Sequence, residues 1–182
     1  MNARRITAAR VNGCSVVTEN VPLPRSAFRT VPGFEATVVW GTTATPTLSW
    51  PGSDSTPHPS SVLPGVGETR LLIVTFPPDS VMADPNFDPA AAGAEYATKL
   101  PGLAELFEPE CPGMHTTVTI DYDVVLEGHI TVEFDDGKMV NLSKGDVVVQ
   151  HGTRHAWRNR GTEPATMLFV LIGAVKSQAQ AQ

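Results

Sequence analysis

The chain has 182 residues, of which 41% are hydrophobic and 18% charged, a composition typical of one folded domain and unlike that of a disordered segment. Its formal net charge is −6, and the sequence contains no strong cluster of Lys and Arg. Since phosphate binding depends on clustered basic side chains, the sequence argues against a nucleic-acid-binding protein.

Targeting and redox signals are also weak. No run approaches the roughly 20 apolar residues of a membrane span, and Met1 to Thr18 lacks the apolar stretch of a signal peptide. We therefore expect a cytoplasmic protein that does not bind membranes. Cys14 and Cys111 lie far apart without a paired spacing, which predicts neither a zinc ribbon nor a disulfide framework.

The first part of the chain alternates between short apolar runs and breaker-rich stretches. The runs Phe34 to Trp40 and Thr69 to Phe76 have the composition and length of strands. Between them, Thr42 to Gly67 is rich in Pro, Ser, Thr and Gly, which predicts a loop.

An irregular stretch follows Pro77 and Pro78. Within it, Ala90 to Phe107 contains Ala-rich and Leu-rich pieces compatible with one or two short helices. A long insertion of this kind immediately before a functional strand is either a lid or a passive surface loop, and the sequence leaves both readings open.

From Thr116 onward the sequence has the pattern of an all-β fold. Turn signals such as Asp135-Asp136-Gly137 separate short runs of β-forming residues, and no helical period intervenes. This spacing predicts an antiparallel sandwich or barrel. The expected strands are Thr117 to Leu126, Ile130 to Phe134, Met139 to Leu142, Asp146 to Gln150, His155 to Asn159 and Ala165 to Ile172.

Two stretches resemble the paired signatures of the cupin superfamily. The first contains His115, Thr117, Asp121 and Gly128 at the signature spacing. The second contains Gly145, then Gln150-His151-Gly152, His155 and Asn159. The resemblance implies an all-β double-stranded β-helix, or jelly-roll barrel, with an N-terminal β arm and a short helical insertion. We expect an arm and loop that pack on the barrel at 1–67, the barrel at 68–174 and a disordered tail at 175–182.

The resemblance also implies one divalent metal ion, held by His115, Asp121 and His155. Alternate side chains along a strand point to one face, so His115, Thr117, Thr119 and Asp121 should face the barrel interior together. The family pattern has a second His where this chain has Thr117, and a Glu where it has Asp121. Two His and one carboxylate suit Fe(II) or Zn(II) with open positions. The shorter carboxylate leaves open that the metal has been lost.

Further residues near these ligands are candidates for chemistry. We expect Thr117 to orient a water or substrate oxygen, and Asp123, of the same parity as Asp121, to act as a general base or to support His115. Gln150 is a third catalytic candidate, while His151 and Trp157 are candidates for contacting substrate.

The function expected from this site is that of a metal-dependent enzyme. Its substrate would be a small dicarbonyl, oxo acid or hydroxy acid, and its chemistry either Fe(II)-dependent dioxygenation or metal-assisted decarboxylation or dehydration. The alternative is a cupin that binds a small molecule without catalysis. Single-barrel cupins commonly dimerise, so we also expect a homodimer, to which the N-terminal arm contributes.

Overall fold

The computed structural model describes residues 3–48 and 61–176, in which every pair of neighbouring strands is antiparallel. A two-stranded sheet pairs β1 (Arg4–Val11) with β2 (Cys14–Pro22). A five-stranded sheet runs in the order β3 (Glu35–Thr42), β4 (Thr69–Phe76), β10 (Ala165–Gly173), β5 (Thr119–Glu127) and β8 (Val147–His151). A three-stranded sheet runs in the order β7 (Met139–Ser143), β6 (His129–Glu133) and β9 (Ala156–Arg158).

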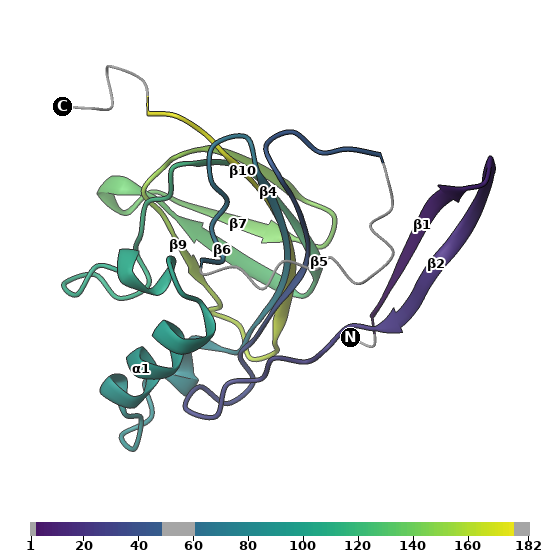
Figure 1. The fold of residues 1–182 in the computed structure, drawn as a ribbon. Helices are drawn as coiled ribbons and strands as arrows, with labels where there is room; N and C mark the ends of the chain where they lie inside the picture. The colour runs from purple at the N-terminus through teal and green to yellow at the C-terminus, as the bar shows by residue number, and fades with distance from the viewer. Residues whose placement is uncertain (1–2, 49–60, 177–182) are drawn as a thin grey trace.

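The five-stranded and three-stranded sheets face each other across the interior (Figure 1). The apolar cluster between them has members in both sheets, among them Val125 of β5, Val132 of β6 and Met167 of β10. Along β5 the buried residues alternate with more exposed ones, as the period of two requires. This arrangement confirms the predicted jelly roll, and each strand expected after Thr116 is present with ends shifted by a few residues.

A second apolar cluster closes one end of the barrel around the helical insertion. It joins Phe28 and Val31 to Leu72 of β4 and to Ala92 and Leu100 of the insertion. The insertion holds α1 (Pro89–Lys99) between two short 3-10 helices, η1 (Asp79–Val81) and η2 (Ala104–Leu106); a third, η3 (Asp135–Gly137), follows β6. The expectation of short helices in Ala90 to Phe107 is therefore confirmed.

Helix α1 has clear start and docking signals. Asp88 caps it by accepting hydrogen bonds from the backbone nitrogens of Ala90 and Ala91, and Pro89 occupies its first turn. The Glu95 carboxylate accepts bonds from the backbone nitrogens of Arg29 and Thr30, and from the Thr30 hydroxyl. These contacts hold the helix against the segment that leads into β3.

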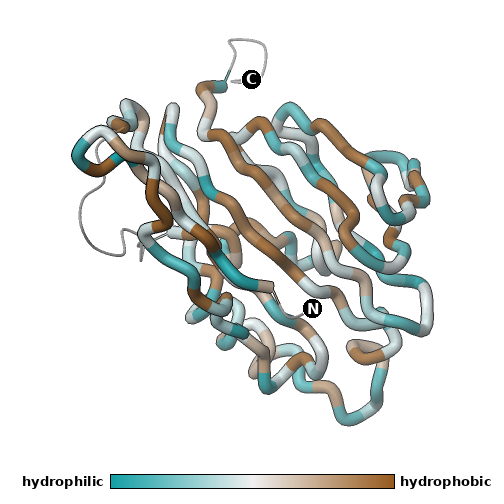
Figure 2. Tube along the Cα trace, turned by 90° about the vertical axis from the view of Figure 1, so that its right-hand side faces the viewer, coloured by the Kyte–Doolittle hydropathy of each residue, from teal (hydrophilic) through white to brown (hydrophobic). Residues whose placement is uncertain are grey.

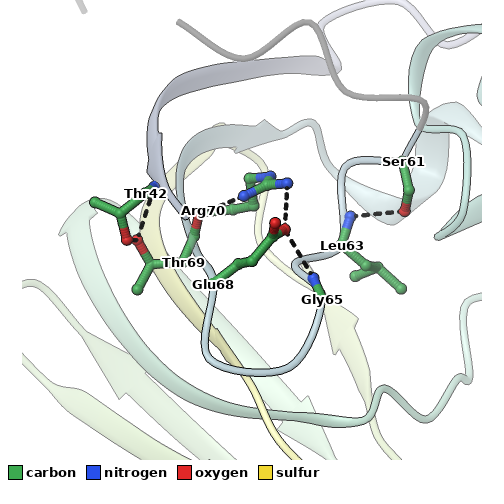
Figure 3. Close-up of polar contacts among 7 residues, drawn as sticks. All are labelled: Thr42, Ser61, Leu63, Gly65, Glu68, Thr69 and Arg70. Atoms are coloured by element: carbon green, nitrogen blue, oxygen red, sulfur yellow. Dashed lines mark hydrogen bonds and ion pairs between the residues drawn. The ribbon is translucent and has the colours of Figure 1, made fainter. Parts of the chain in front are cut away.

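Polar contacts fix the segment before β4 (Figure 3). One Glu68 carboxylate oxygen accepts bonds from the Gly65 nitrogen and from the Arg70 guanidinium. At Gly173 in β10, an added Cβ would lie 1.9 Å from the Gly65 carbonyl oxygen, so only glycine permits this close approach. The described parts of the predicted loop, 43–48 and 61–67, contain no strand, and 49–60 lie outside the described residues.

The expected N-terminal β arm includes a β1–β2 hairpin, a form that was not predicted although the sequence contains its signal. Asn12 and Gly13 join the two strands with φ of 51° and 83°, and an Asn-Gly pair between apolar runs is the usual signal for a tight hairpin. Figure 1 shows the hairpin projecting away from the barrel. Of the predicted tail, 177–182 lies outside the described residues. Among the described residues, no helix is long and apolar enough to span a bilayer.

Candidate functional site

Two buried imidazoles meet inside the barrel. His115 and His155 form an antiparallel bridge in which each backbone nitrogen donates to the other's carbonyl oxygen, at 3.0 and 2.9 Å. Their ring centroids are 4.4 Å apart, and the residues are 8% and 3% exposed. The bridge therefore joins the end of the insertion to the start of β9 and brings two predicted ligands together.

The hydrogen bonds of both rings indicate their tautomer. The Nδ1 atoms of His115 and His155 each lie 3.0 Å from a backbone carbonyl oxygen, of Gly113 and Thr153 respectively. Because a carbonyl only accepts, Nδ1 carries the proton in each ring and Nε2 keeps its lone pair. Burial lowers the pKa of His115, and burial together with the neighbouring His115 lowers the pKa of His155 to about 4. Both rings are thus neutral at pH 7.

Asp121 lies on the same inner face as the imidazole pair. It is 3% exposed, and its Oδ1 has no hydrogen-bond partner among the described residues. Burial raises its pKa to about 6, against the opposing hydrogen bond from Thr119. The hydroxyls of Thr117 and Thr119 are 2.6 Å apart, so this face presents a short polar row. His115, Thr117, Thr119 and Asp121 are all buried, as the strand period predicts.

Gln150 of β8 connects a buried carboxyl group to one imidazole. Its Oε1 accepts a hydrogen bond from the Thr153 hydroxyl at 2.6 Å, and its Nε2 donates to Asp123 Oδ2 at 2.8 Å. The same nitrogen lies 3.3 Å from His155 Nε2, which accepts its second hydrogen in the tautomer given above. Gln150 thereby fixes the orientation of the His155 ring.

Asp123 is fully buried behind this amide. Its burial, with a smaller contribution from the charge of Asp121, raises its pKa to about 7, while the bond from Gln150 opposes the shift. Its Oδ2 accepts a hydrogen bond from Gln150, through which it connects to His155, whereas Nδ1 of His115 is bonded to Gly113. Asp123 therefore supports His155 through Gln150, whereas the sequence suggested that it would support His115.

A cavity of about 470 Å³ opens on the imidazole pair. Its polar lining includes His115, Thr117, Asp121 and His155, and Trp157 also lines it. Of the other predicted site residues, Gln150 and Asp123 lie behind this lining. His151 is exposed on the opposite face of β8, because it directly follows the inward-facing Gln150.

Most of the cavity wall was not predicted from the sequence. The insertion contributes Phe87, Tyr96 and Phe107, and the segment before β3 contributes Phe34. No common spacing connects these residues to the cupin signatures, so only the fold reveals that they share a cavity. The insertion is thus a wall of the site rather than a passive surface loop.

The donor atoms suit a divalent metal, although they do not form a complete ligand group in this arrangement. Among residues 3–48 and 61–176, no three His, Cys, Asp or Glu side chains are grouped closely enough to hold an ion. The chemistry nevertheless fits, since two neutral imidazoles have Nε2 lone pairs and Asp121 has an unpartnered buried oxygen. A metal at His155 Nε2 would replace the hydrogen bond from Gln150.

Fold and sequence comparison agree on the class of protein. The family model of the cupin domain matches residues 112–171, the stretch that includes β5 to β9, most of β10 and both imidazoles. The chain therefore contains a cupin domain.

Sequence comparison finds similar proteins in fungi. The chain is 41% identical over 70 residues to oryzines biosynthesis cluster protein J of Aspergillus oryzae, which is 37% of this chain and 39% of the relative. It is 50% identical over 62 residues to phomopsin biosynthesis cluster protein C' of Diaporthe leptostromiformis, a match that covers 34% of this chain and 33% of the relative. It is 42% identical over 62 residues to the cupin-domain-containing oxidoreductase fogC of Aspergillus ruber, a match that covers 32% of this chain and 30% of the relative. The chain thus matches about a third of the length of these relatives.

Proposed function

We propose that this protein is a metal-dependent cupin enzyme acting on a small oxygenated organic molecule, such as a dicarbonyl, an oxo acid or a hydroxy acid. The observation that carries the proposal is the pair of buried, neutral imidazoles, His115 and His155, whose cavity also contains the unpartnered oxygen of Asp121. Two His and one carboxylate, with positions left open, form a ligand set of catalytic metal sites.

In this proposal each residue has a distinct role. His115, His155 and Asp121 hold one divalent ion, which when bound would act as a Lewis acid or, as Fe(II), support oxygen chemistry. The Thr117 hydroxyl, already paired with Thr119, orients a substrate oxygen at the cavity wall. Gln150 and Asp123 act as positioning residues that orient His155 before the ion binds, because Gln150 donates to both His155 and Asp123 and the ion would replace only its bond to His155.

The relatives' names support an oxidative reaction. One carries the name cupin-domain-containing oxidoreductase, and two are named as products of biosynthesis clusters. We therefore rank Fe(II)-dependent dioxygenation above metal-assisted decarboxylation or dehydration.

The reaction is tested on protein stripped of metal and reloaded with Fe(II) or Zn(II). Oxygen uptake and product mass are measured with a β-diketone, a 2-oxo acid and a 2-hydroxy acid. We expect oxygen consumption with Fe(II), its loss in Asp121→Asn, and its retention in His129→Ala, since His129 is an exposed residue bonded to Ser143. Turnover with Zn(II) and no oxygen uptake would instead establish the redox-neutral reaction.

The second candidate function is a cupin that binds a small molecule without converting it. It is favoured by the absence of a complete three-residue ligand group in the described part of the chain. If the protein binds members of the substrate panel in the same cavity but turns over none with any metal, this function replaces the enzymatic one.

A further inference from the structure

The wall of the cavity contains a closed circuit of aromatic rings. Each ring in the circuit contacts the next, with centroid separations between 4.4 and 6.3 Å. The circuit runs through Phe34, Phe76, Phe169, Trp157, His155, His115, Phe107 and Tyr96, and returns to Phe34. All of these residues line the cavity. The two proposed metal-binding imidazoles are therefore part of the same aromatic wall.

The circuit is assembled from distant parts of the chain. Phe34 precedes β3, Phe76 ends β4, and Phe169 lies on β10. Tyr96 is on α1, and Phe107 follows η2. Trp157 lies on β9. Separate segments thus place aromatic rings around one volume, and the rest of the lining is mostly aliphatic, with Leu72, Leu103 and Leu171 among its members.

The polar part of the lining has two groups of residues. Thr117 and Asp121 line the cavity with the imidazole pair, while Asp79, Glu108 and Arg158 are the other charged residues of the lining. The aromatic rings offer π faces and edges. A ligand that satisfied both parts would expose oxygen atoms to the imidazoles and place an apolar body among the rings. Aromatic side chains favour flat, π-containing partners, with which they form offset-stacked or edge-to-face contacts.

We propose that the cavity selects a planar aromatic or conjugated ring compound whose oxygen substituents face His115, His155 and Asp121. The inference narrows the substrate class of the proposed function and rests on that function for its catalytic meaning. The volume of about 470 Å³ falls within the usual range for one small organic ligand, roughly 300–1,000 Å³.

Planarity is tested by binding alone, on the metal-free protein. Isothermal titration calorimetry would compare 1-naphthol with decahydro-1-naphthol, which keeps the hydroxyl group and the two fused rings but is saturated and not flat. An aromatic contact contributes about 0.5–1.5 kcal/mol beyond its buried area, so several contacts predict at least about tenfold tighter binding of 1-naphthol.

Two variants remove rings from the wall and keep apolar volume. Trp157→Leu and Phe107→Leu should each weaken 1-naphthol binding about fivefold while changing decahydro-1-naphthol binding little. The matched control is Phe134→Leu, since Phe134 packs against the cluster between the sheets and does not line the cavity. Circular dichroism verifies that each variant is folded, and either ring variant suffices if the other fails to fold.

Equal affinity for the two compounds, no binding of 1-naphthol, or an unchanged preference in the folded ring variants would overturn the inference. Its failure is distinguishable from failure of the proposed function, because binding is measured without metal, whereas that function is tested by metal-dependent turnover.

A different observation concerns the outer face of the five-stranded sheet. Residues paired across its strands place apolar side chains on this face in continuous rows. One row joins Ile73, Leu168, Val124 and Val147; the next joins Trp40, Leu71, Val170, Tyr122 and Val149. Tyr122, Val147 and Val149 are 43%, 58% and 55% exposed. Figure 2 shows hydrophobic stretches side by side in neighbouring strands of this sheet.

The projecting hairpin adjoins this face. The Arg5 guanidinium of β1 lies over the Trp40 ring, 5.3 Å from its centroid, and Ile6 and Val17 of the hairpin are 52% and 64% exposed. A two-stranded hairpin is at best marginally stable by itself, so packing against another surface would stabilise it.

A homodimer is already expected from the resemblance to single-barrel cupins. We infer that this outer face is its interface, with each hairpin packed against the second copy in a two-fold symmetric dimer. Strands about 4.8 Å apart and rising about 3.3 Å per residue give the sheet face an area of about 500 Å². With the hairpin, the surface approaches the roughly 800 Å² per partner of a standard stable interface. The same surface meets itself across a two-fold axis, as such dimers require.

Sedimentation velocity at micromolar concentrations tests the dimer. The unmodified protein should sediment as a dimer and Val149→Asp as a folded monomer. Val140→Asp, at a 49% exposed valine of β7 in the other sheet, should remain dimeric. A monomeric unmodified protein, or a dimer that persists in Val149→Asp, would contradict the inference.

Discussion

Replacing Asp123 with Asn should stabilise the metal-free protein at pH 8 and have little effect at pH 4. Asp123 is fully buried, and burial raises its pKa from 3.8 to about 7. At pH 4 the carboxyl group is protonated in the folded state and resembles the neutral amide of Asn. At pH 8 it is ionised in a site where one of its oxygens has no hydrogen-bond partner.

The sign and size follow from proton linkage. Between pH 4 and pH 7 the folded state binds a proton at Asp123 that the unfolded state has released, so this group's contribution to stability falls as pH rises. A shift of about three units, at 1.36 kcal/mol per unit, corresponds to at most about 4 kcal/mol. His155 acts in the opposite direction, because its pKa is lowered and the unfolded state gains its proton below about pH 6.5.

Comparing variant with unmodified protein at each pH removes the His155 contribution from the difference. Urea unfolding, followed by circular dichroism in the presence of a chelator, would give the free energy of unfolding at pH 4 and pH 8. Asp136→Asn, an exposed turn position, is the control and should show no such pH-dependent difference. If Asp123→Asn is no more stable than the unmodified protein at pH 8, the burial argument is wrong.

Two further substitutions test the packing around the site. Gln150→Leu would leave Asp123 Oδ2 and the Thr153 hydroxyl without their buried partner, so the free energy of unfolding should fall by about 1–3 kcal/mol. The melting temperature should fall with it, and an unchanged melting temperature would show that the network is not formed. Gly128→Ala should cost far more than Gly137→Ala in urea unfolding. Both glycines have positive φ, but an added Cβ lies 2.7 Å from the Pro164 carbonyl oxygen at Gly128 and meets nothing within 4 Å at Gly137. Equal costs would refute the close packing of this turn.

The barrel could be predicted because local pattern determines it, whereas the meeting of His115 and His155 was implied by the resemblance to cupins. Alternation along β5 places Thr119, Asp121 and Asp123 on the inner face whatever the details of packing. The same parity places His151 outside once Gln150 is inside, so the position of His151 could also have been derived from the sequence.

The remaining features depend on contacts between distant segments. Phe34, Tyr96 and Phe107 have no shared spacing with His115, and only the packing of α1 on the barrel end brings them to one cavity. The two hydrogen bonds from Gln150 to Asp123 and His155 likewise depend on the pairing of β5 with β8. The hairpin at Asn12 and Gly13 is different, because its Asn-Gly signal is local and can be read from the sequence.

Bound metal is the most direct test of the central claim that His115, His155 and Asp121 form a metal centre. Elemental analysis of the purified protein, reloaded with Fe(II) or Zn(II), should find one ion per chain. His115→Ala and His155→Ala should lose that ion, and His129→Ala should retain it. Full metal content in folded His155→Ala, or none in the unmodified protein, would contradict the assignment.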